Sequence, residues 1–376
     1  MKRKKTSYKT EKYIPRVGGE FEIRMEDLIL PGFDGIGIGG AHSIQRHYLD
    51  FDTGRSALYA ALQNIMHRNG QRVAWLPAYT CNSVILPFQK CGFDIRFYSM
   101  GEDLQSPDKL PDKLDKETFL FIHYFGLINK PVIEWLTEMR KSHNFFVIED
   151  CVQALFSENA GQYGDYVINS YRKFLPLPDG AMLCSRFPFT CVDRAQPDEG
   201  FISRRLMGKI LRQYAADELA FMDLFNEAEN IIDKSIIPRE MSWISKYLLK
   251  RIDMAAVSQK RRSNWLRLNK LLETEIFKAY AVQALFSALT EGEVPMGMPI
   301  IVGNGQRDKL RQYLISKNIF CPVHWPLLNK VYSNMEIQGE TNLSNSMLTL
   351  PIDQRIDQNQ LEYMTEQIRA FYSQNN

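Results

Sequence analysis

An acidic residue and a lysine follow two neighbouring predicted strands of this sequence. The apolar run 145–148 ends in Glu149 and Asp150, as a buried parallel strand does when it places an acid at its carboxyl end. A second predicted strand, 166–169, leads into a loop that carries Lys173. The prolines and the glycine that follow exclude a regular helix, so we expect this lysine to lie on a constrained loop.

These two residue types suit a pyridoxal phosphate site. Lysine forms a Schiff base with the aldehyde of that cofactor, and an acid pairs with its pyridinium nitrogen. Taken alone, Asp150 also fits a helix cap or a turn, and Lys173 fits an ordinary surface charge. The hypothesis therefore depends on the rest of the chain.

A candidate phosphate site begins the helical pattern in 52–66. Gly54, Arg55 and Ser56 precede apolar residues at helical spacing. Free backbone amides, a hydroxyl group and the positive end of the helix dipole would together hold a phosphate monoester. Ordinary capping of the helix is the alternative.

Alternating strands and helices must position these residues. Short strand patterns lie at 72–76, 93–98, 119–124 and 145–148, with helical patterns at 82–90 and 131–142, and a further helix is expected from about Cys151. The alternation predicts an α/β fold with a mainly parallel central sheet, whose strand ends converge on one crevice. Those ends carry Tyr79, Thr80, His123, Tyr124, Asp150, Gln153, Ser170 and Lys173.

Further regions flank the predicted sheet. The basic helical stretch 203–212 is expected to be a solvated face, with a cradle for an anionic substrate as the alternative. His324 and Trp325 lie where a small α/β lobe should face the crevice, although a core or surface pair would also explain them. We divide the chain into an N-terminal arm (1–50), a large cofactor-binding domain (51–235), and connecting helices with a small C-terminal domain (236–376).

Composition narrows the function classes. The 376 residues carry a net charge of +2, which argues against a nucleic-acid partner. No segment approaches the length needed to cross a bilayer, and the basic leader lacks the apolar stretch of a secretion signal, so we expect a cytoplasmic protein without membrane insertion. The six cysteines and six histidines are scattered without metal-ligand spacing, so the cysteines are interpreted as reduced thiols and no metal site is expected.

With these segments in place, the chain resembles the DegT/StrS family of pyridoxal phosphate sugar aminotransferases, which have the type I (aspartate aminotransferase) fold. The resemblance covers most of the sequence in the family's order. It rests on TGRSALYAAL, RVAWLPAYTCNSV, FIHYFG, VIEDCVQAL, SYRKFLPLPDGAML and MLTLPID. Three departures stand out: SYRK is compact, Cys81 replaces the aromatic residue expected to stack on the ring, and the glycine and asparagine motif that reaches the neighbour's phosphate is missing.

The resemblance implies a role for each matching residue. Lys173 would form the Schiff base and later move the proton, while Asp150 would pair with the ring nitrogen. Gln153 would bind the ring hydroxyl, and Tyr79 or Tyr124 would replace the stacking aromatic. The phosphate ligands would be Gly54, Arg55, Ser56 and Ser170, and the substrate contacts would be His123, Tyr124 and His324.

The function implied is transfer of an amino group from a donor such as glutamate to a keto group of a nucleotide-linked sugar. Such an enzyme serves polysaccharide or glycoconjugate synthesis, and its site would form between the two subunits of a homodimer. A sugar dehydratase or other lyase with the same cofactor is one alternative, against which the retained Lys173 argues. A non-catalytic regulator that keeps the fold is the other.

Overall fold

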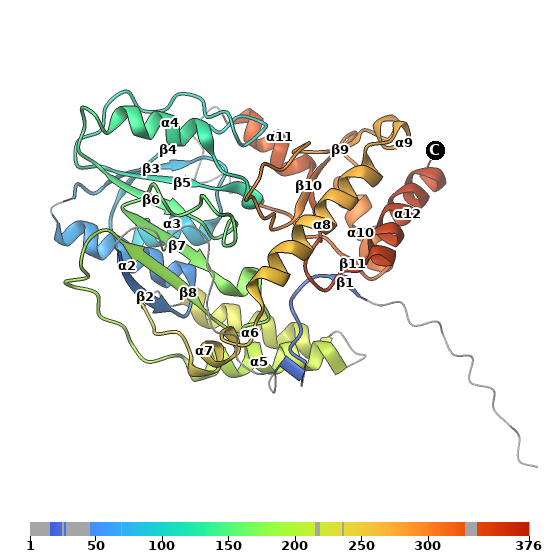
Figure 1. Cartoon of the computed structure of the whole chain (residues 1–376), viewed down its shortest axis with the longest axis horizontal. Helices are drawn as coiled ribbons and strands as arrows, with labels where there is room; N and C mark the ends of the chain where they lie inside the picture. Colours follow the sequence, from blue (N-terminus) through green and yellow to red (C-terminus); the bar gives the residue numbers. More distant parts are fainter. Residues whose placement is uncertain are drawn as a thin grey trace, which may run out of the picture.

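The computed structural model describes residues 16–24, 26–27, 46–68, 70–214, 219–234, 237–327 and 337–375. These residues form a larger and a smaller lobe, which lie side by side in Figure 1. Most of the segment that we expect to be an N-terminal arm lies outside the described residues. Its described part begins with β1 (Val17–Gly18).

The larger lobe is built on a seven-stranded sheet. Its strands are β2 (His47–Phe51), β3 (Val73–Pro77), β4 (Asp94–Tyr98), β5 (Thr118–Ile122), β6 (Phe146–Asp150), β7 (Tyr166–Ser170) and β8 (Ala181–Ser185). The order is β2-β8-β7-β6-β5-β3-β4, in which β3 to β7 run parallel and β8 is antiparallel to both of its neighbours. Both β5 and β7 are buried at every position, as strands covered on two faces must be. The predicted α/β class with a mainly parallel sheet is confirmed.

Three helices of the larger lobe connect these strands: α2 (Gly54–His67), α3 (Asn82–Lys90) and α4 (Lys130–Met139). The apolar residues that predicted α2 are buried, and the helix packs on α3, β7 and β8. A Cβ atom added to Gly54 would lie 3.8 Å from the Cβ of Ser170. The first turn of α2 therefore lies beside the carboxyl end of β7.

The connections after β5 and β6 are tight. After β5, a 3₁₀ turn (Tyr124–Gly126) brings Gly126 to a φ of +95°, and a Cβ atom there would lie 2.2 Å from the Val294 carbonyl oxygen. The helix expected from about Cys151 is absent, and residues 151–165 form a series of turns. The physical reason is that the Glu149 side chain accepts three backbone amides of this segment, which a helix would have bonded internally.

The smaller lobe has its own apolar core. An antiparallel sheet of β9 (Val282–Ala284), β10 (Met298–Val302) and β12 (Met347–Leu350) has the order β12-β10-β9, and β11 (Ile319–Phe320) pairs in parallel with β1. The helices are α8 (Met254–Leu272), α9 (Glu275–Ala279), α10 (Arg307–Ser316), α11 (Gln338–Ser346) and α12 (Gln358–Asn375). Figure 1 shows α8 extending from the lobe toward the larger one.

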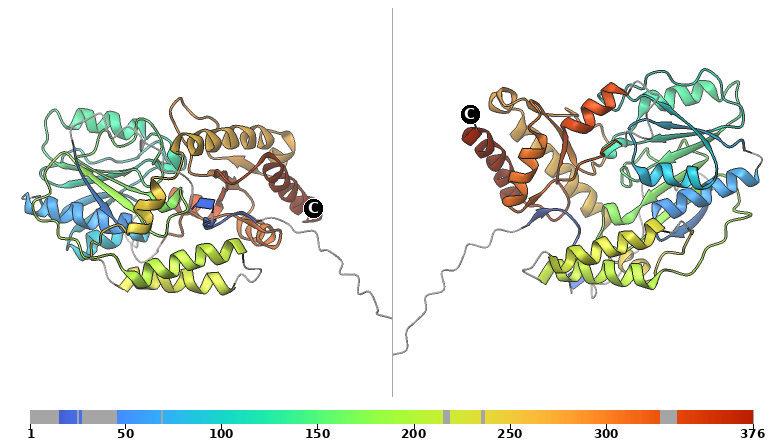
Figure 2. Two further views of the ribbon diagram at one scale, coloured as in Figure 1. Left: turned by 60° about the horizontal axis from the view of Figure 1, so that its bottom comes forward. Right: turned by 180° about the vertical axis from the view of Figure 1, so that it is seen from behind.

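Two antiparallel helices, α5 (Glu199–Tyr214) and α6 (Leu219–Lys234), form a hairpin beside the larger lobe (Figure 2). The short helix α7 (Trp243–Leu249) follows. The expected solvated basic face on 203–212 is wrong, because Arg205, Lys209 and Arg212 are buried. The first two pair with Glu20 of the N-terminal segment, which lies across α5.

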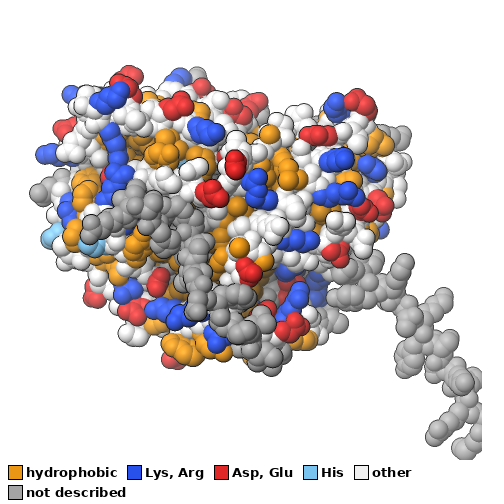
Figure 3. All heavy atoms as spheres, in the orientation of Figure 1, with side chains coloured by type: hydrophobic (Ala, Val, Ile, Leu, Met, Phe, Trp, Pro, Cys, Tyr) orange, Lys and Arg blue, Asp and Glu red, His pale blue; other side chains and the backbone are white. Residues whose placement is uncertain are grey.

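The charged surface is mixed. Basic and acidic side chains alternate over the face drawn in Figure 3, without a large patch of one sign there. Among the described residues, no helix combines the length and the apolar composition that a membrane span requires.

Candidate active site

Lys173 and Asp150 line one cavity, which we call the central cavity. The ends of β6 and β7 and the first turn of α2 form it together with α6 and the smaller lobe. Its lining residues are Thr53, Gly54, Arg55, Leu58, Cys81, Ser83, Val84, Ile122, Asp150, Val152, Gln153, Ile168, Ser170, Arg172, Lys173, Ile232, Met296, His324 and Trp325. The strand ends therefore converge on one crevice, as the alternation of elements predicts.

Asp150 is the last residue of β6 and is 4% exposed. Its Oδ1 accepts a hydrogen bond of 2.9 Å from the Val152 amide, and no described cation forms an ion pair with it. Burial raises the pKa of this carboxyl to about 6, against the opposing effects of the Val152 amide, His123 and Lys173. The site thus contains a buried carboxylate that lacks a cationic partner.

Lys173 ends a 3₁₀ turn (Tyr171–Lys173) that follows β7. Within the described part of the chain, its amine has no hydrogen-bond or ion-pair partner. Burial within the molecule, followed by the charge of Arg172, lowers the pKa of this amine, although the side chain keeps accessible surface because it faces the central cavity and a second one. A neutral amine is the form that acts as nucleophile or base.

The first turn of α2 can hold an anion. Thr53 caps the helix by accepting from the Ser56 amide, while the amides of Gly54 and Arg55 have no acceptor among the described residues. Ser56 does not line the central cavity. Its hydroxyl accepts from Thr53 at 3.0 Å and lines a smaller cavity that also contains Asp52.

Gln153 and Ser170 add polar groups to the cavity. The Oε1 of Gln153 accepts a hydrogen bond of 2.7 Å from the Phe125 amide, which fixes the side chain and leaves its NH₂ group as a donor for a ligand. Ser170 is the last residue of β7, is buried and also lines the cavity.

An aromatic cluster borders the cavity. The Tyr79 hydroxyl donates to the His324 carbonyl, and the Tyr124 hydroxyl donates to the Tyr79 carbonyl at 2.6 Å. Neither tyrosine lines the central cavity, whereas Cys81, Trp325 and His324 do. The Trp325 ring lies 5.7 Å from the Tyr79 ring. An indole therefore borders the cavity, in a region where the sequence resemblance led us to name tyrosines.

Comparisons with known proteins agree with this architecture. No family model matches the sequence. Over 71% of this chain and 70% of the relative, the sequence is 23% identical to GDP-perosamine synthase of Escherichia coli O157:H7. NtdA of Bacillus subtilis, solved with bound PMP, has a TM-score of 0.62 at 15% identity and is matched over 86% of this chain and 73% of NtdA. A DegT/DnrJ/EryC1/StrS aminotransferase of Brucella abortus has a TM-score of 0.58 at 15% identity over 86% of both chains.

The chain is thus similar in sequence to a GDP-perosamine synthase and similar in fold to a DegT/DnrJ/EryC1/StrS aminotransferase. The structural likenesses show its type I fold. The chain departs at Cys81, which lines the central cavity, from the sequence pattern that the resemblance implies.

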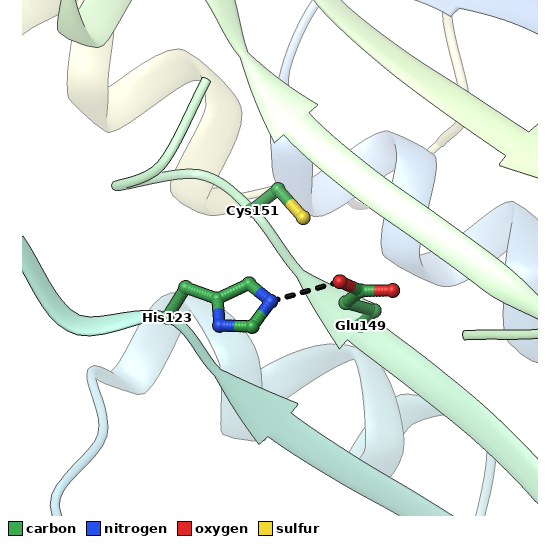
Figure 4. Close-up of side chains that lie close together, drawn as sticks. All are labelled: His123, Glu149 and Cys151. Atoms are coloured by element: carbon green, nitrogen blue, oxygen red, sulfur yellow. Dashed lines mark hydrogen bonds and ion pairs between the residues drawn. The ribbon is translucent and has the colours of Figure 1, made fainter. Parts of the chain in front are cut away.

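His123, which the resemblance implies to be a substrate contact, lies outside the central cavity. It is buried and outside the cavity lining, and its Nδ1 accepts from the Asn129 amide at 3.1 Å. Nε2 therefore carries the proton and donates to Glu149 at 2.8 Å (Figure 4). The amides of Gly161, Tyr163 and Gly164 also bind Glu149.

These hydrogen bonds determine the direction in which the pKa of Glu149 shifts in the group drawn in Figure 4. Burial alone would raise the pKa of Glu149, but the His123 hydrogen bond and the backbone amides lower it. Cys151 completes a set of metal-ligand types, yet the imidazole nitrogens and the carboxylate oxygens are already engaged. We interpret the group as an internal brace for the turns that follow β6.

Two functional candidates were missed in the sequence. Arg172 lines the cavity and donates to Glu229 of α6 at 2.7 Å, and Ile232 of α6 lines the cavity as well. Acidic residues four positions apart on α6, Glu229 and Asp233, were the available signal. The partners of these acids could not be identified from the sequence, because even the nearer one, Arg172, lies 57 residues from Glu229 in the chain.

Proposed function

We propose that the protein is a pyridoxal phosphate-dependent aminotransferase that moves an amino group, with glutamate as the donor, to a keto group of a nucleotide-linked sugar. The observation that carries the proposal is the shared cavity of Lys173 and an Asp150 without a cationic partner. The curated relative is a GDP-perosamine synthase, and one structural neighbour contains PMP. Both support this assignment.

The residues present fit this cofactor. A pyridinium nitrogen would supply the cation that Asp150 lacks. The NH₂ group of Gln153 is oriented as a donor for a ring hydroxyl, and the amides of Gly54 and Arg55 are available to a phosphate. Lys173 offers an amine whose pKa is lowered, as Schiff-base formation requires.

Asp150 and Lys173 would have different roles in the proposed reaction. Bound pyridoxal phosphate supplies an electron sink for the charge left when a carbon-bound proton is removed. Asp150 would hold the protonated ring nitrogen and so maintain that sink. Lys173 Nζ would be the base that takes a proton from the donor carbon and the acid that returns it. His324 and Trp325 line the central cavity on the side of the smaller lobe.

An absorbance scan tests the proposal. Protein loaded with pyridoxal phosphate should show the visible band of a lysine-bound cofactor, and glutamate should shift that band. Lys173→Ala should abolish the band and reduce turnover by several orders of magnitude. A wild-type protein that takes up no cofactor would contradict the assignment and favour a non-catalytic regulator.

Labelled glutamate identifies the reaction. With ¹⁵N-glutamate and a panel of keto sugars linked to nucleotides, an aminotransferase delivers the label to the sugar. A dehydratase or lyase would instead release water or another fragment without transferring nitrogen. The panel also identifies the sugar and the carbon that is aminated.

Assembly, location and domain limits belong to the same proposal. We propose a homodimer in the cytoplasm, with domain limits near residues 50 and 235, as expected from the sequence. Sedimentation of the protein loaded with pyridoxal phosphate tests the oligomeric state. Expression of residues 51–235 alone tests whether the large domain folds by itself.

A further inference from the structure

Trp325 brings an indole ring to the wall of the central cavity. It lies in the loop that follows β11 of the smaller lobe, whereas Asp150 and Lys173 reach the same cavity from strand ends of the larger lobe. Among the described residues that line the cavity, no other has a phenyl, phenol or indole ring. The Trp325 side chain is only partly buried, so it keeps surface that a ligand can contact.

Two buried tyrosines pack against this indole. The ring centre of Trp325 lies 5.7 Å from that of Tyr79 and 6.4 Å from that of Tyr124. Aromatic rings attract one another at these distances. Both tyrosines are 0% exposed, and neither lines the cavity. They therefore support Trp325 and leave the indole as the ring that a ligand in the cavity can meet.

Hydrogen bonds from both lobes fix the backbone around Trp325. The Ser344 hydroxyl of α11 donates to the Trp325 carbonyl at 2.6 Å. The Tyr79 hydroxyl of the larger lobe donates to the carbonyl of the preceding residue, His324. The His324 ring is engaged as well, because its Nδ1 lies 2.9 Å from the Thr349 hydroxyl oxygen. Little freedom is therefore left to be lost when a ligand packs on the indole.

A flat aromatic cofactor would gain from this indole in two ways. Offset stacking of two rings adds affinity beyond the burial of apolar area, and indole has the largest ring surface of any side chain. The face of an indole also carries negative charge density, which attracts a protonated pyridinium ring. Asp150 would stabilise the same protonated form from the edge of the ring. The acid and the indole therefore favour one state of the cofactor.

We propose that Trp325 stacks on the pyridine ring of the cofactor, so that bound pyridoxal phosphate contacts both lobes. This inference rests on the proposed function. It assigns to Trp325 the contact for which the sequence led us to name Tyr79 or Tyr124. The small side chain of Cys81, which lines the same cavity, leaves room for a ring that comes from the other lobe.

Affinities of matched variants test the stacking. Trp325→Leu should weaken the binding of pyridoxal phosphate about tenfold, and Trp325→Phe, which keeps an aromatic face, should weaken it less than about threefold. Pyridoxal, which lacks the phosphate, should lose the same factor in Trp325→Leu, because the contact is with the ring. An unchanged affinity in Trp325→Leu, or a loss confined to pyridoxal phosphate, would overturn the inference.

Trp75→Leu is the control for the general loss of an indole. Trp75 of β3 is also partly buried, lies outside the cavity lining and donates to Glu117 at 3.0 Å. Its replacement should leave the affinities for both ligands unchanged. If Trp75→Leu and Trp325→Leu lose equal affinity, the effect of Trp325 is structural and the inference fails.

A spectroscopic signature and a rescue separate stacking from a structural role. The visible circular dichroism of a bound cofactor depends on the rings beside it, so Trp325→Leu should change its amplitude and Trp75→Leu should not. Cys81→Phe, which adds a ring to the same cavity, should restore most of the affinity lost in Trp325→Leu. An unchanged dichroism or a failed rescue would overturn the inference.

Failure of the proposed function would look different. A wild-type protein that binds neither pyridoxal phosphate nor pyridoxal would overturn the proposed function itself. A wild-type protein that binds both ligands, with Trp325→Leu binding them equally well, would overturn only the assignment of Trp325.

Discussion

The buried Asp150 carboxylate in the central cavity should lower the stability of the folded chain. Burial raises its pKa from 3.8 to about 6. Between these pH values the folded state binds more protons than the unfolded state, so stability falls as the pH rises through this interval. Above pH 6 the full cost applies, which is about 3 kcal/mol.

Asp150→Asn should therefore stabilise the cofactor-free protein while it abolishes function. We expect a free energy of unfolding up to about 3 kcal/mol higher than that of the wild type at pH 7.5, because the buried charge is removed. The gain should vanish below pH 4, where Asp150 is protonated in both states. Urea unfolding of both proteins across this range measures the difference.

The loaded protein supplies the control for this variant. With pyridoxal phosphate bound, the wild-type carboxylate has its cationic partner, so the order of stability should reverse and turnover of Asp150→Asn should fall by orders of magnitude. If the variant is less stable than the wild type without cofactor, interactions within the protein already offset the cost of burying the Asp150 charge.

Residues at strand ends were predictable, whereas the directions of several side chains were not. Asp150 and Lys173 share a cavity because the ends of parallel strands meet at one edge. Ser56, Tyr79 and His123 are engaged elsewhere, by Thr53, by the His324 carbonyl and by Glu149. These partners come from a helix cap, a distant loop and a neighbouring strand, and sequence spacing does not reveal the contacts.

At the scale of elements, α5 shows why a basic helix was misjudged. Its charged pattern predicts exposure, yet Arg205 is 2% and Lys209 is 0% exposed. The element that covers them is the segment around Glu20, which bonds Arg205 at 2.9 Å across 185 residues of sequence. A pairing between such distant elements leaves no periodic signal along the chain.

Glu20→Gln should separate this segment from α5. The change leaves Arg205 and Lys209 buried without their shared carboxylate, and we expect the free energy of unfolding to fall by about 2 kcal/mol. The partial exposure of Glu20, 39% of its side chain, keeps the cost below that of a fully buried pair.

Denaturant unfolding of Glu20→Gln measures this loss, and Glu227→Gln is its control. That second variant breaks an exposed pair on the same hairpin, so it should change stability by less than about 0.5 kcal/mol. If the two variants lose equal stability, Glu20 does not hold the N-terminal segment on α5.

At the scale of the whole molecule, Arg261 of α8 joins the lobes. The residue is 1% exposed, and its guanidinium donates to the carbonyls of Met296 at 2.8 Å and of Phe174 at 3.4 Å. Phe174 follows Lys173, and its ring lies 4.6 Å from the guanidinium carbon. The loop that carries the lysine is thus tied to the helix that extends between the lobes (Figure 1).

Arg261→Met should affect stability and cofactor binding together. Methionine fills much of the same space but leaves the Met296 carbonyl without its Arg261 donor, while the Phe174 carbonyl keeps its bond of 2.8 Å from Gln354. The free energy of unfolding should therefore fall by about 2 kcal/mol. Because the lysine loop loses its anchor, affinity for pyridoxal phosphate should fall as well. Arg267→Met on the same helix removes an exposed pair with Glu362 and should change neither quantity. Unfolding curves and absorbance titrations of both variants measure these changes. If Arg261→Met loses stability but keeps the wild-type affinity for pyridoxal phosphate, the Arg261 contact between the lobes does not affect cofactor binding.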